Sequence, residues 1–258
     1  MLSKQTLEKM TTLRLHTMAQ SCQRLLESPE SSRLTAEEIV GLSVDAEYTE
    51  RQNKRLKQLL KKASLADNAC MEDIEYSSER GLDKTTMVRL AEGLYIREQN
   101  HILVTGKTGC GKTFVICALG QMACRRNIPV YYIRVPKLLI DMNIAKQEGT
   151  YSKFLTLLRK ATLLILDDWG LIPFTEEAGR DLLEIAEERY RNGSMIIASQ
   201  LPVANWYDVF PDPTIADACL DRILHKSYRI EMKGGNMRKK KSSIRDEKEN
   251  LLVVSKEL

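Results

Sequence analysis

A segment of eight residues combines glycine, lysine and threonine at the spacing that binds nucleotide phosphates. Residues 106–113 read Gly-Lys-Thr-Gly-Cys-Gly-Lys-Thr and match the pattern G-x-x-x-x-G-K-[ST]. Glycines let the backbone curl so that successive N–H groups face an anion, while Lys112 can reach the β- and γ-phosphates and Thr113 can ligate Mg²⁺. A glycine-rich turn would not explain the Lys-Thr pair. The segment predicts a site for ATP and Mg²⁺ formed by Gly106, Lys107, Thr108, Gly109, Cys110, Gly111, Lys112 and Thr113.

Two aspartates could complete the site by binding the metal ion and activating water. Asp167 and Asp168 follow the apolar run Thr162–Leu166, which has the composition of a strand buried on both faces. Ligands of open α/β folds bind at the C-terminal edge of the sheet, where such a strand delivers its last residues. We expect Asp167 to hold Mg²⁺, usually through water, and Asp168 to polarise the attacking water. The alternative is a pair of aspartates that opens a turn.

Two further polar residues follow another apolar run. Ser199 and Gln200 come directly after Met195–Ala198, so a strand there would deliver them to the same sheet edge as Asp167. In P-loop machines of the AAA+ type, a polar residue at this place contacts the γ-phosphate or the water. Ser199 or Gln200 is therefore a candidate sensor, and a turn before Pro202 is the alternative.

These residues need a parallel sheet to bring them together, and the sequence alternates strands with helices accordingly. Two helices separate the second and third strands, one more than a minimal βαβ unit requires. We predict an α/β fold with a five-stranded parallel sheet flanked by helices. The expected strands are 101–105, 128–135, 162–166, 195–198 and 228–232, and the expected helices are 82–95, the segment from Phe114, 136–146, 151–161, 175–191 and 215–225.

The N-terminal quarter reads as helical throughout. Apolar residues recur at three- and four-residue steps from Leu7 to Leu25, which predicts one amphipathic helix that ends at Ser28-Pro29. A second helix begins at a capping-box pattern at Thr35 and keeps an apolar stripe to Ala63. We predict a small all-helical N-terminal domain over 1–66, a polar connector over 67–80, and a nucleotide-binding domain with a basic C-terminal tail over 81–258.

The second half of that long helix is strongly basic. A net charge of +4 on a chain that is 29% charged makes the bulk field mild, so nucleic-acid affinity must come from local clusters. Two interpretations fit this cluster equally well. It is either a solvated helix end that complements the helix dipole or a face that contacts DNA phosphates. The residues are Arg51, Lys54, Arg55, Lys57, Lys61 and Lys62.

The cysteine, histidine and hydropathy patterns argue against a zinc protein, a secreted protein and a membrane protein. The six cysteines form no C-x-x-C pair and the three histidines lie far apart, so the sequence does not predict a zinc site. Cys117 and Cys124 are expected to be small buried residues of a protein in a reducing compartment. Neither a signal-peptide pattern nor an apolar run long enough to cross a bilayer is present, and we expect a cytoplasmic protein with no membrane partner.

Taken together, these motifs resemble the IstB/DnaC-like branch of the AAA+ ATPases, and within it the IstB-like ATP-binding proteins that help the transposition of insertion sequences. The resemblance covers nearly the whole chain. Trp169 stands where phenylalanine is expected in this family, a change in packing that leaves the chemistry intact. The residues that carry the resemblance are 13–16, 79–83, the phosphate loop 106–113, 166–170, 199–202 and 220–223.

The resemblance implies roles that residue patterns alone do not give. Arg222 would be an arginine finger that reaches the γ-phosphate held by a neighbouring subunit, so ATP would lie at the interfaces of a homo-oligomer. The alternative for Arg222 is a simple helix-end charge. The insertion 136–148, with Lys137, would face DNA. Arg238 would be a second sensor, although the residues that follow the fifth strand are too few for a full helical lid, which is truncated or absent.

The sequence therefore favours an ATP-dependent, DNA-binding ATPase that assists a transposase, with Lys112, Thr113, Asp167 and Asp168 acting in one subunit and Arg222 on its neighbour. Its expected partners are double-stranded DNA and the transposase of the same element. A DnaC-like loader of a replicative helicase is the first alternative. A small-molecule P-loop kinase lacks support, because the extra residues form basic helices rather than an acceptor pocket. A DNA scaffold that binds ATP and barely hydrolyses it is the third alternative.

Overall fold

Five segments form the strands of one sheet in the computed structural model, which describes residues 4–29 and 33–235. Neighbouring strands lie in the order β2-β3-β4-β1-β5, and every pairing is parallel. The predicted five-stranded parallel sheet is confirmed, and β1, β4 and β3 end next to one another at its C-terminal edge. The strands are β1 (His101–Gly106), β2 (Val130–Arg134), β3 (Leu163–Trp169), β4 (Ser194–Ser199) and β5 (Ser227–Met232).

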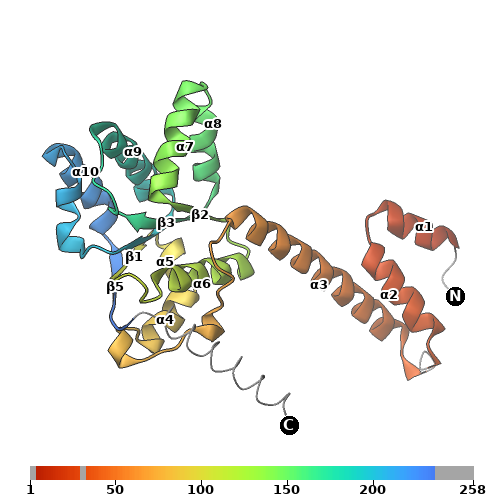
Figure 1. Ribbon diagram of the computed structural model, residues 1–258. Helices are drawn as coiled ribbons and strands as arrows, with labels where there is room; N and C mark the ends of the chain where they lie inside the picture. The colour runs from red at the N-terminus through yellow and green to blue at the C-terminus, as the bar shows by residue number, and fades with distance from the viewer. Residues whose placement is uncertain (1–3, 30–32, 236–258) are drawn as a thin grey trace, which may run out of the picture. The chain divides into compact units, whose positions relative to one another are not determined.

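Most helices lie close to the predicted bounds, and Figure 1 shows those that follow β1 around the sheet. The single helix expected over 82–95 is two helices, because the chain turns at Gly93, whose φ is +77°. None of the helices in the described part of the chain is long and apolar enough to cross a membrane. The α-helices are α1 (Lys4–Thr12), α2 (His16–Glu27), α3 (Ala36–Ala63), α4 (Lys84–Ala91), α5 (Leu94–Arg97), α6 (Lys112–Arg125), α7 (Val135–Gln147), α8 (Tyr151–Lys160), α9 (Glu176–Asn192) and α10 (Pro213–Leu224). The short 3-10 helices are η2 (Met71–Asp73), η3 (Ser78–Arg80), η4 (Val203–Asn205) and η5 (Tyr207–Val209).

Both faces of the sheet are covered, as the apolar character of its strands requires. Helix α6 crosses one face so closely that a Cβ built on Gly120 would lie 2.7 Å from Ile165 Cδ1 of β3. The alternate residues Leu164 and Leu166 join the core formed with α7, α9 and α10 on the other face. Trp169, which stands where phenylalanine is expected in the family, is buried there against Phe174 in an aromatic cluster.

The chain divides into two compact units, the helical unit Met1–Gln58 and the sheet unit Leu59–Leu258. The division falls within α3, whereas the sequence placed the domain boundary after residue 66. That boundary stays a prediction. The capping box at the start of α3 is confirmed, because Thr35 N–H donates to Glu38 Oε2 at 2.7 Å and Glu38 N–H donates to Thr35 Oγ1 at 3.2 Å.

One helix predicted for the N-terminus is two helices in the structure, and a distant side chain explains the break. The chain turns at Arg14, whose φ is +58°, between α1 and α2. Glu47 of α3 then accepts the N–H groups of Thr17 and Met18 in the first turn of α2, at 2.9 and 3.0 Å. A carboxylate at this place satisfies donors that a helix start leaves unpaired. The apolar period continues through the break and could not reveal it.

Candidate nucleotide-binding site

The phosphate loop connects β1 to α6 with the geometry that the motif predicts. Its glycines are required at two places. A Cβ on Gly106 would lie 2.3 Å from the carbonyl oxygen of Met232, and Gly111 has φ +96° directly before α6 begins at Lys112. The start of α6 places backbone N–H groups and the positive end of the helix at the loop. This arrangement is suited to phosphate.

The ammonium group of Lys112 lies within the loop. Its Nζ donates to the carbonyl oxygens of Gly106 at 2.7 Å and Lys107 at 3.1 Å, and the residue is buried. Few lysines are buried without a strong reason. When phosphate binds, the Lys112 ammonium can exchange these two neutral carbonyl acceptors for phosphate oxygens, which are stronger hydrogen-bond partners because they are charged.

Asp167 meets Thr113 across the sheet edge, as the two metal ligands predicted from the sequence should. Thr113 Oγ1 donates to Asp167 Oδ2 at 2.8 Å, and the carboxylate also accepts the hydroxyl of Tyr132 at 2.9 Å and the N–H of Asp168 at 2.9 Å. Burial, and the charge of Asp167, raise the pKa of Tyr132 well above its ordinary value, so its hydroxyl stays protonated and donates. The two oxygen ligands on adjacent elements fit Mg²⁺, a hard cation.

Asp168 reaches the same place because β3 departs from a regular strand. The register between β3 and β4 shifts between Leu166 and Trp169, and Asp168 has φ +58°. In a regular strand successive side chains point to opposite faces, whereas a bulge re-aims one of them. The Asp168 carboxylate is bound by Arg134 of β2, whose Nε donates to Oδ2 at 2.6 Å. The sequence did not identify Arg134 or Tyr132 as site residues.

The two sensor candidates have different environments. Gln200 lies at the loop, where its Oε1 accepts the Thr108 hydroxyl at 2.6 Å. Ser199 is fully buried, and its Oγ donates to the carbonyl of Trp169 at 2.7 Å and accepts the N–H of Leu201 at 3.0 Å. The structure therefore brings Gln200 to the phosphate loop and commits Ser199 to the packing between β3 and β4.

Lys112, Asp168 and Gln200 line a hollow of about 650 Å³ together with Thr113, Tyr132, Arg134 and Asp167, and the connector forms one of its walls. The connector was predicted as a link between domains and was given no site residue. The wall holds both polar groups and the buried side chain of Ile74. The lining residues from the connector and the one residue before it are Ala66, Asp67, Asp73, Ile74, Glu75 and Arg80.

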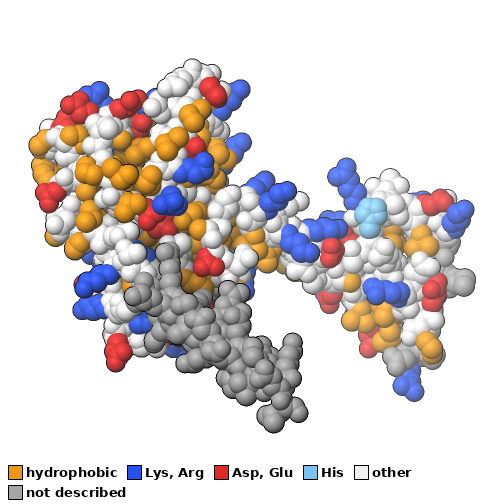
Figure 2. All heavy atoms as spheres, viewed as in Figure 1, with side chains coloured by type: hydrophobic (Ala, Val, Ile, Leu, Met, Phe, Trp, Pro, Cys, Tyr) orange, Lys and Arg blue, Asp and Glu red, His pale blue; other side chains and the backbone are white. Residues whose placement is uncertain are grey.

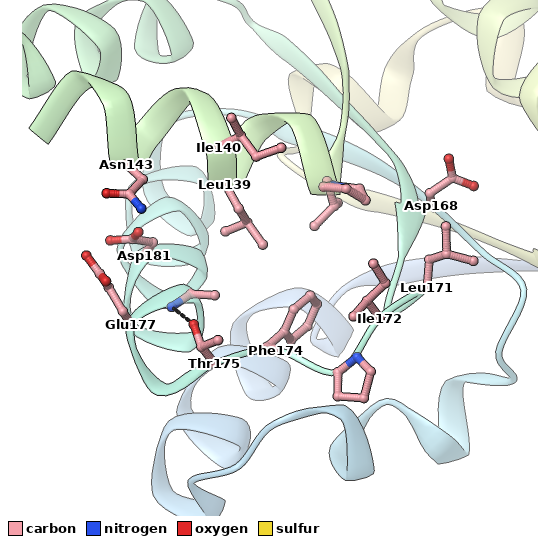
Figure 3. Close-up of a pocket in the computed structure, with 14 residues that line it drawn as sticks. Leu139, Ile140, Asn143, Asp168, Leu171, Ile172, Phe174, Thr175, Glu177 and Asp181 are labelled. Carbon is pink, nitrogen blue, oxygen red and sulfur yellow. Dashed lines mark hydrogen bonds between the residues drawn. The ribbon is translucent and has the colours of Figure 1, made fainter. Parts of the chain in front are cut away.

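A second hollow of about 340 Å³ adjoins the first, and Asp168 borders both. Figure 3 shows Leu139 and Ile140 of α7 on one side of it, and Ile172 and Phe174 of the segment between β3 and α9 on the other. Ile140 and Ile172 are each at least 60% exposed. The space next to the Asp168 carboxylate is thus mainly apolar.

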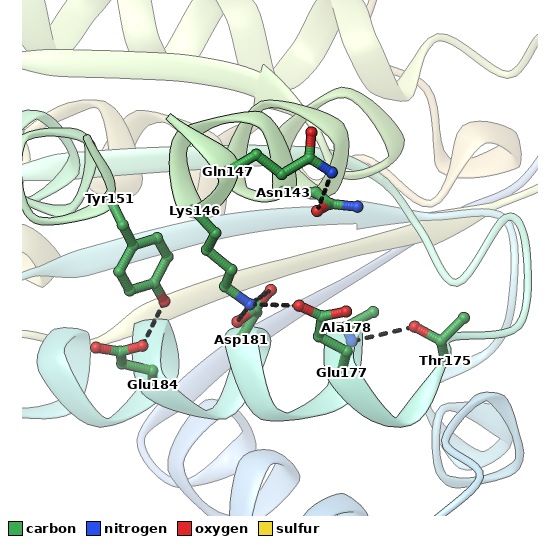
Figure 4. Close-up of polar contacts among 9 residues, drawn as sticks. All are labelled: Asn143, Lys146, Gln147, Tyr151, Thr175, Glu177, Ala178, Asp181 and Glu184. Carbon is green, nitrogen blue, oxygen red and sulfur yellow. Dashed lines mark hydrogen bonds and ion pairs between the residues drawn. The ribbon is translucent and has the colours of Figure 1, made fainter. Parts of the chain in front are cut away.

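Ion pairs and a hydrogen bond fasten α7 and α8, the two helices between β2 and β3, to α9, as Figure 4 shows for the contacts of Lys146 and Tyr151. Lys146 Nζ lies 2.7 Å from Asp181 and 2.9 Å from Glu177, and the Tyr151 hydroxyl donates to Glu184 at 2.5 Å. Burial raises the pKa of Asp181, which the lysine opposes. The insertion that the sequence singled out is therefore tied to the core of the sheet unit.

Arg222 does not line the nucleotide hollow of its own chain. It extends from α10, where its Nη1 donates to the carbonyl of Ala218 at 2.6 Å and its Nη2 forms an ion pair with Glu187 of α9. The phosphate loop of the same chain therefore receives no arginine from α10. Arg238 lies outside the described residues.

The predicted DNA-binding residues divide into paired and unpaired groups. Arg51 donates to Glu47 at 2.8 Å and to the carbonyl of Arg14 at 2.9 Å, so it stabilises the helical unit. Lys54 pairs with Glu50 at 3.4 Å and Lys137 with Asp141 at 3.0 Å. No ion pair within the described ranges involves the remaining exposed residues, and Figure 2 shows Lys and Arg side chains along α3. These are Arg55, Lys57, Lys61 and Lys62.

Comparison with known proteins gives a family that agrees with this geometry. The model of the IstB-like ATP binding protein family matches residues 8–245. An insertion sequence ATP-binding protein of Sinorhizobium fredii is 41% identical over 239 residues, which cover 93% of this chain and 98% of that protein.

Solved structures give the fold. DnaA from Aquifex aeolicus, with AMPPCP bound, has a TM-score of 0.57 and 21% identity, covering 67% of this chain and 52% of that chain. The DnaC helicase loader has a TM-score of 0.51 and 19% identity, covering 58% of this chain and 87% of that chain. The predicted AAA+ P-loop core is confirmed, and likeness at these identities extends no further than the fold.

Proposed function

The chain belongs to the family of IstB-like ATP binding proteins, and on this premise we propose that it is an Mg²⁺-dependent ATPase that assembles on DNA and assists the transposase of an insertion sequence. The observation that carries the proposal is the meeting of Lys112 and Thr113 with Asp167 and Asp168 at one hollow. The start of α6 supplies the phosphate-binding lysine and one metal ligand, and the end of β3 supplies the other metal ligand and the water-activating carboxylate. Phosphoryl transfer to water needs this set of groups.

In the proposed mechanism each side chain acts from its observed position. Lys112 exchanges its two carbonyl partners for phosphate oxygens, and Thr113 and Asp167 would hold Mg²⁺. Mg²⁺ bound there would neutralise phosphate charge. Asp168 accepts a proton from the attacking water after it separates from Arg134, and Gln200 contacts the terminal phosphate or the water.

Assembly would complete this site. Arg222 lies away from the nucleotide hollow of its own chain, which supports a role on the nucleotide of a neighbouring subunit. An arginine supplied by a neighbour stabilises charge that develops in the transition state. A single subunit should therefore hydrolyse ATP slowly, and activity should rise with protein concentration. Arg238 keeps its proposed role as a second sensor.

DNA would bind to the exposed basic face of α3 and to Lys137 on α7. Lys54, Lys57 and Lys61 share a face of the helix because their spacings are three and four residues, and Arg55 and Lys62 lie beside them. The name of the Sinorhizobium fredii relative places that protein in an insertion sequence, and this supports a transposase as the partner.

The proposal is tested by measuring phosphate release with and without double-stranded DNA, and by affinity purification with the transposase encoded beside the gene. We expect DNA to accelerate release and the transposase to co-purify when ATP is present. Turnover that ignores DNA, with no transposase retained, would contradict it. The fold shared with the DnaC helicase loader keeps helicase loading as the second candidate, and retention of a replicative helicase instead would favour that function.

A further inference from the structure

Arg80 is a second cation beside the phosphate loop, contributed by the connector. Its Nη2 donates to the carbonyl oxygen of Cys110 at 3.2 Å, and its Nη1 donates to the carbonyl oxygen of Glu75 at 2.6 Å. A Cβ built on Gly111 would lie 3.0 Å from the same Nη2. The guanidinium thus bridges the connector to the peptide that joins Cys110 to Gly111.

In the proposed nucleotide site, that peptide would contribute directly to phosphate binding. In a planar trans peptide, the C=O of one residue and the N–H of the next point in opposite directions. A donor that fixes the direction of the Cys110 carbonyl therefore also fixes the direction of the Gly111 N–H. Backbone N–H groups of such loops cradle the α- and β-phosphates. The contact from Arg80 sets the orientation of one of them before nucleotide binds.

The backbone around Arg80 is itself held firmly. The Arg80 carbonyl accepts the N–H of Lys233, just beyond β5, at 2.9 Å. The next residue, Gly81, has φ +68°, and a Cβ there would lie 2.2 Å from the carbonyl oxygen of Glu231. Because the backbone of Arg80 is held against the end of β5, the side chain reaches the loop from a fixed point.

Stability alone does not explain an arginine at this position. The Arg80 Nε is buried and has no hydrogen-bond partner among the described residues. An unsatisfied buried donor is unfavourable, and this offsets part of what the two hydrogen bonds of the guanidinium contribute to stability. What arginine adds is a donor for the loop carbonyl and a positive charge at the phosphate site.

We propose that Arg80 is a positioning residue for nucleotide binding, which holds the Cys110–Gly111 peptide so that its N–H faces the phosphates and adds positive charge to the loop. This inference rests on the proposed nucleotide site and extends it to the connector. Because the peptide serves phosphates shared by ATP and ADP, loss of Arg80 weakens both nucleotides alike. At saturating ATP the turnover number stays close to that of the unchanged protein, since binding that is equal in the ground and transition states affects KM alone.

The test measures the affinity of the full chain for ATP and ADP by fluorescent-nucleotide titration, together with kcat, KM and Tm. Arg80→Ala should bind both nucleotides about tenfold more weakly, as expected for one charged hydrogen bond. Arg80→Lys, which keeps the charge and one donor, should fall between. The matched control is Arg125→Ala, which removes the 2.6 Å ion pair with Glu72 that ties the connector to α6 without touching the loop. It should retain wild-type affinity.

Parallel measurement of Lys112→Ala separates this inference from the proposed nucleotide site. If Lys112→Ala abolishes binding while Arg80→Ala binds ATP and ADP normally, the role of Arg80 is wrong and the site stands. If Lys112→Ala also binds normally, the site itself is wrong. An equal loss of affinity in Arg125→Ala would reduce Arg80 to a packing residue. Should Arg80→Ala fail to fold, Arg80→Gln and Arg80→Lys decide by the same comparison.

Discussion

Replacing Arg134 by alanine should accelerate ATP hydrolysis, because the Asp168 carboxylate must leave Arg134 before it can accept a proton. Arg134 Nε lies 2.6 Å from Asp168 Oδ2, and the arginine side chain is 57% exposed while that of Asp168 is 21% exposed. Ion pairs with this degree of exposure contribute about 0.2–1 kcal/mol. Removing the need to break the pair should raise kcat by up to about fivefold, with little change in Tm.

Salt dependence provides the assay. Added salt screens an exposed pair, so kcat of the unchanged protein should rise between low and physiological ionic strength, whereas kcat of Arg134→Ala should already be high and vary less. Arg125→Ala, which removes another partly exposed ion pair, away from the site, serves as the control and should retain the original salt response. A slower Arg134→Ala enzyme would refute the reasoning and show that Arg134 aligns Asp168 for catalysis.

Three further predictions concern assembly, DNA and the helical unit. Arg222→Ala should lose ATPase activity and keep ATP affinity, and mixing it with Lys112→Ala subunits should restore some turnover; no recovery at any ratio would argue against a finger acting between subunits. Replacing Lys54, Arg55, Lys61 and Lys62 together should weaken binding to all DNA sequences and lower the slope of log affinity against log salt by up to about one unit per residue, whereas replacing Lys84, Arg89 and Arg97 should leave the slope intact. The N–H of Met18, with Arg51 and Thr17, lowers the pKa of Glu47, so the contribution of Glu47 to stability is present above the unfolded pKa of about 4.3 and is lost as pH falls through the lower folded pKa. The stability of Glu47→Gln, measured by denaturation as a function of pH, should lack this loss. An acid response like that of the unchanged protein would count against the cap.

Local patterns predicted the parts of the site that one short segment contains. The phosphate loop is continuous in sequence, and an apolar run that ends in two aspartates marks the end of a buried strand. The sequence did not identify Tyr132 and Arg134, because they lie near Asp167 and Asp168 only if β2 pairs with β3. The periodicity of either strand does not predict which strands pair.

The same limit explains the other differences. Arg80 lies in a segment that contributed to the family resemblance, but its contact with Cys110 depends on the path of the connector back to the loop. Ser199 and Gln200 are equally polar in sequence, and only the alternation of directions at the end of β4 separates the buried residue from the one at the loop. The break before α2 depends on Glu47, thirty residues away from Thr17.

The most direct test of the central claim is a comparison of ATP binding and phosphate release in Lys112→Ala and Asp168→Asn. Lys112→Ala removes the charge that compensates the phosphates and should lose tight ATP binding, and with it turnover. Asp168→Asn keeps the phosphate loop and the Thr113–Asp167 pair and removes the base, so it should bind ATP normally and release no phosphate above the uncatalysed rate. Phosphate release at the unchanged rate in either variant would contradict the assignment of this site.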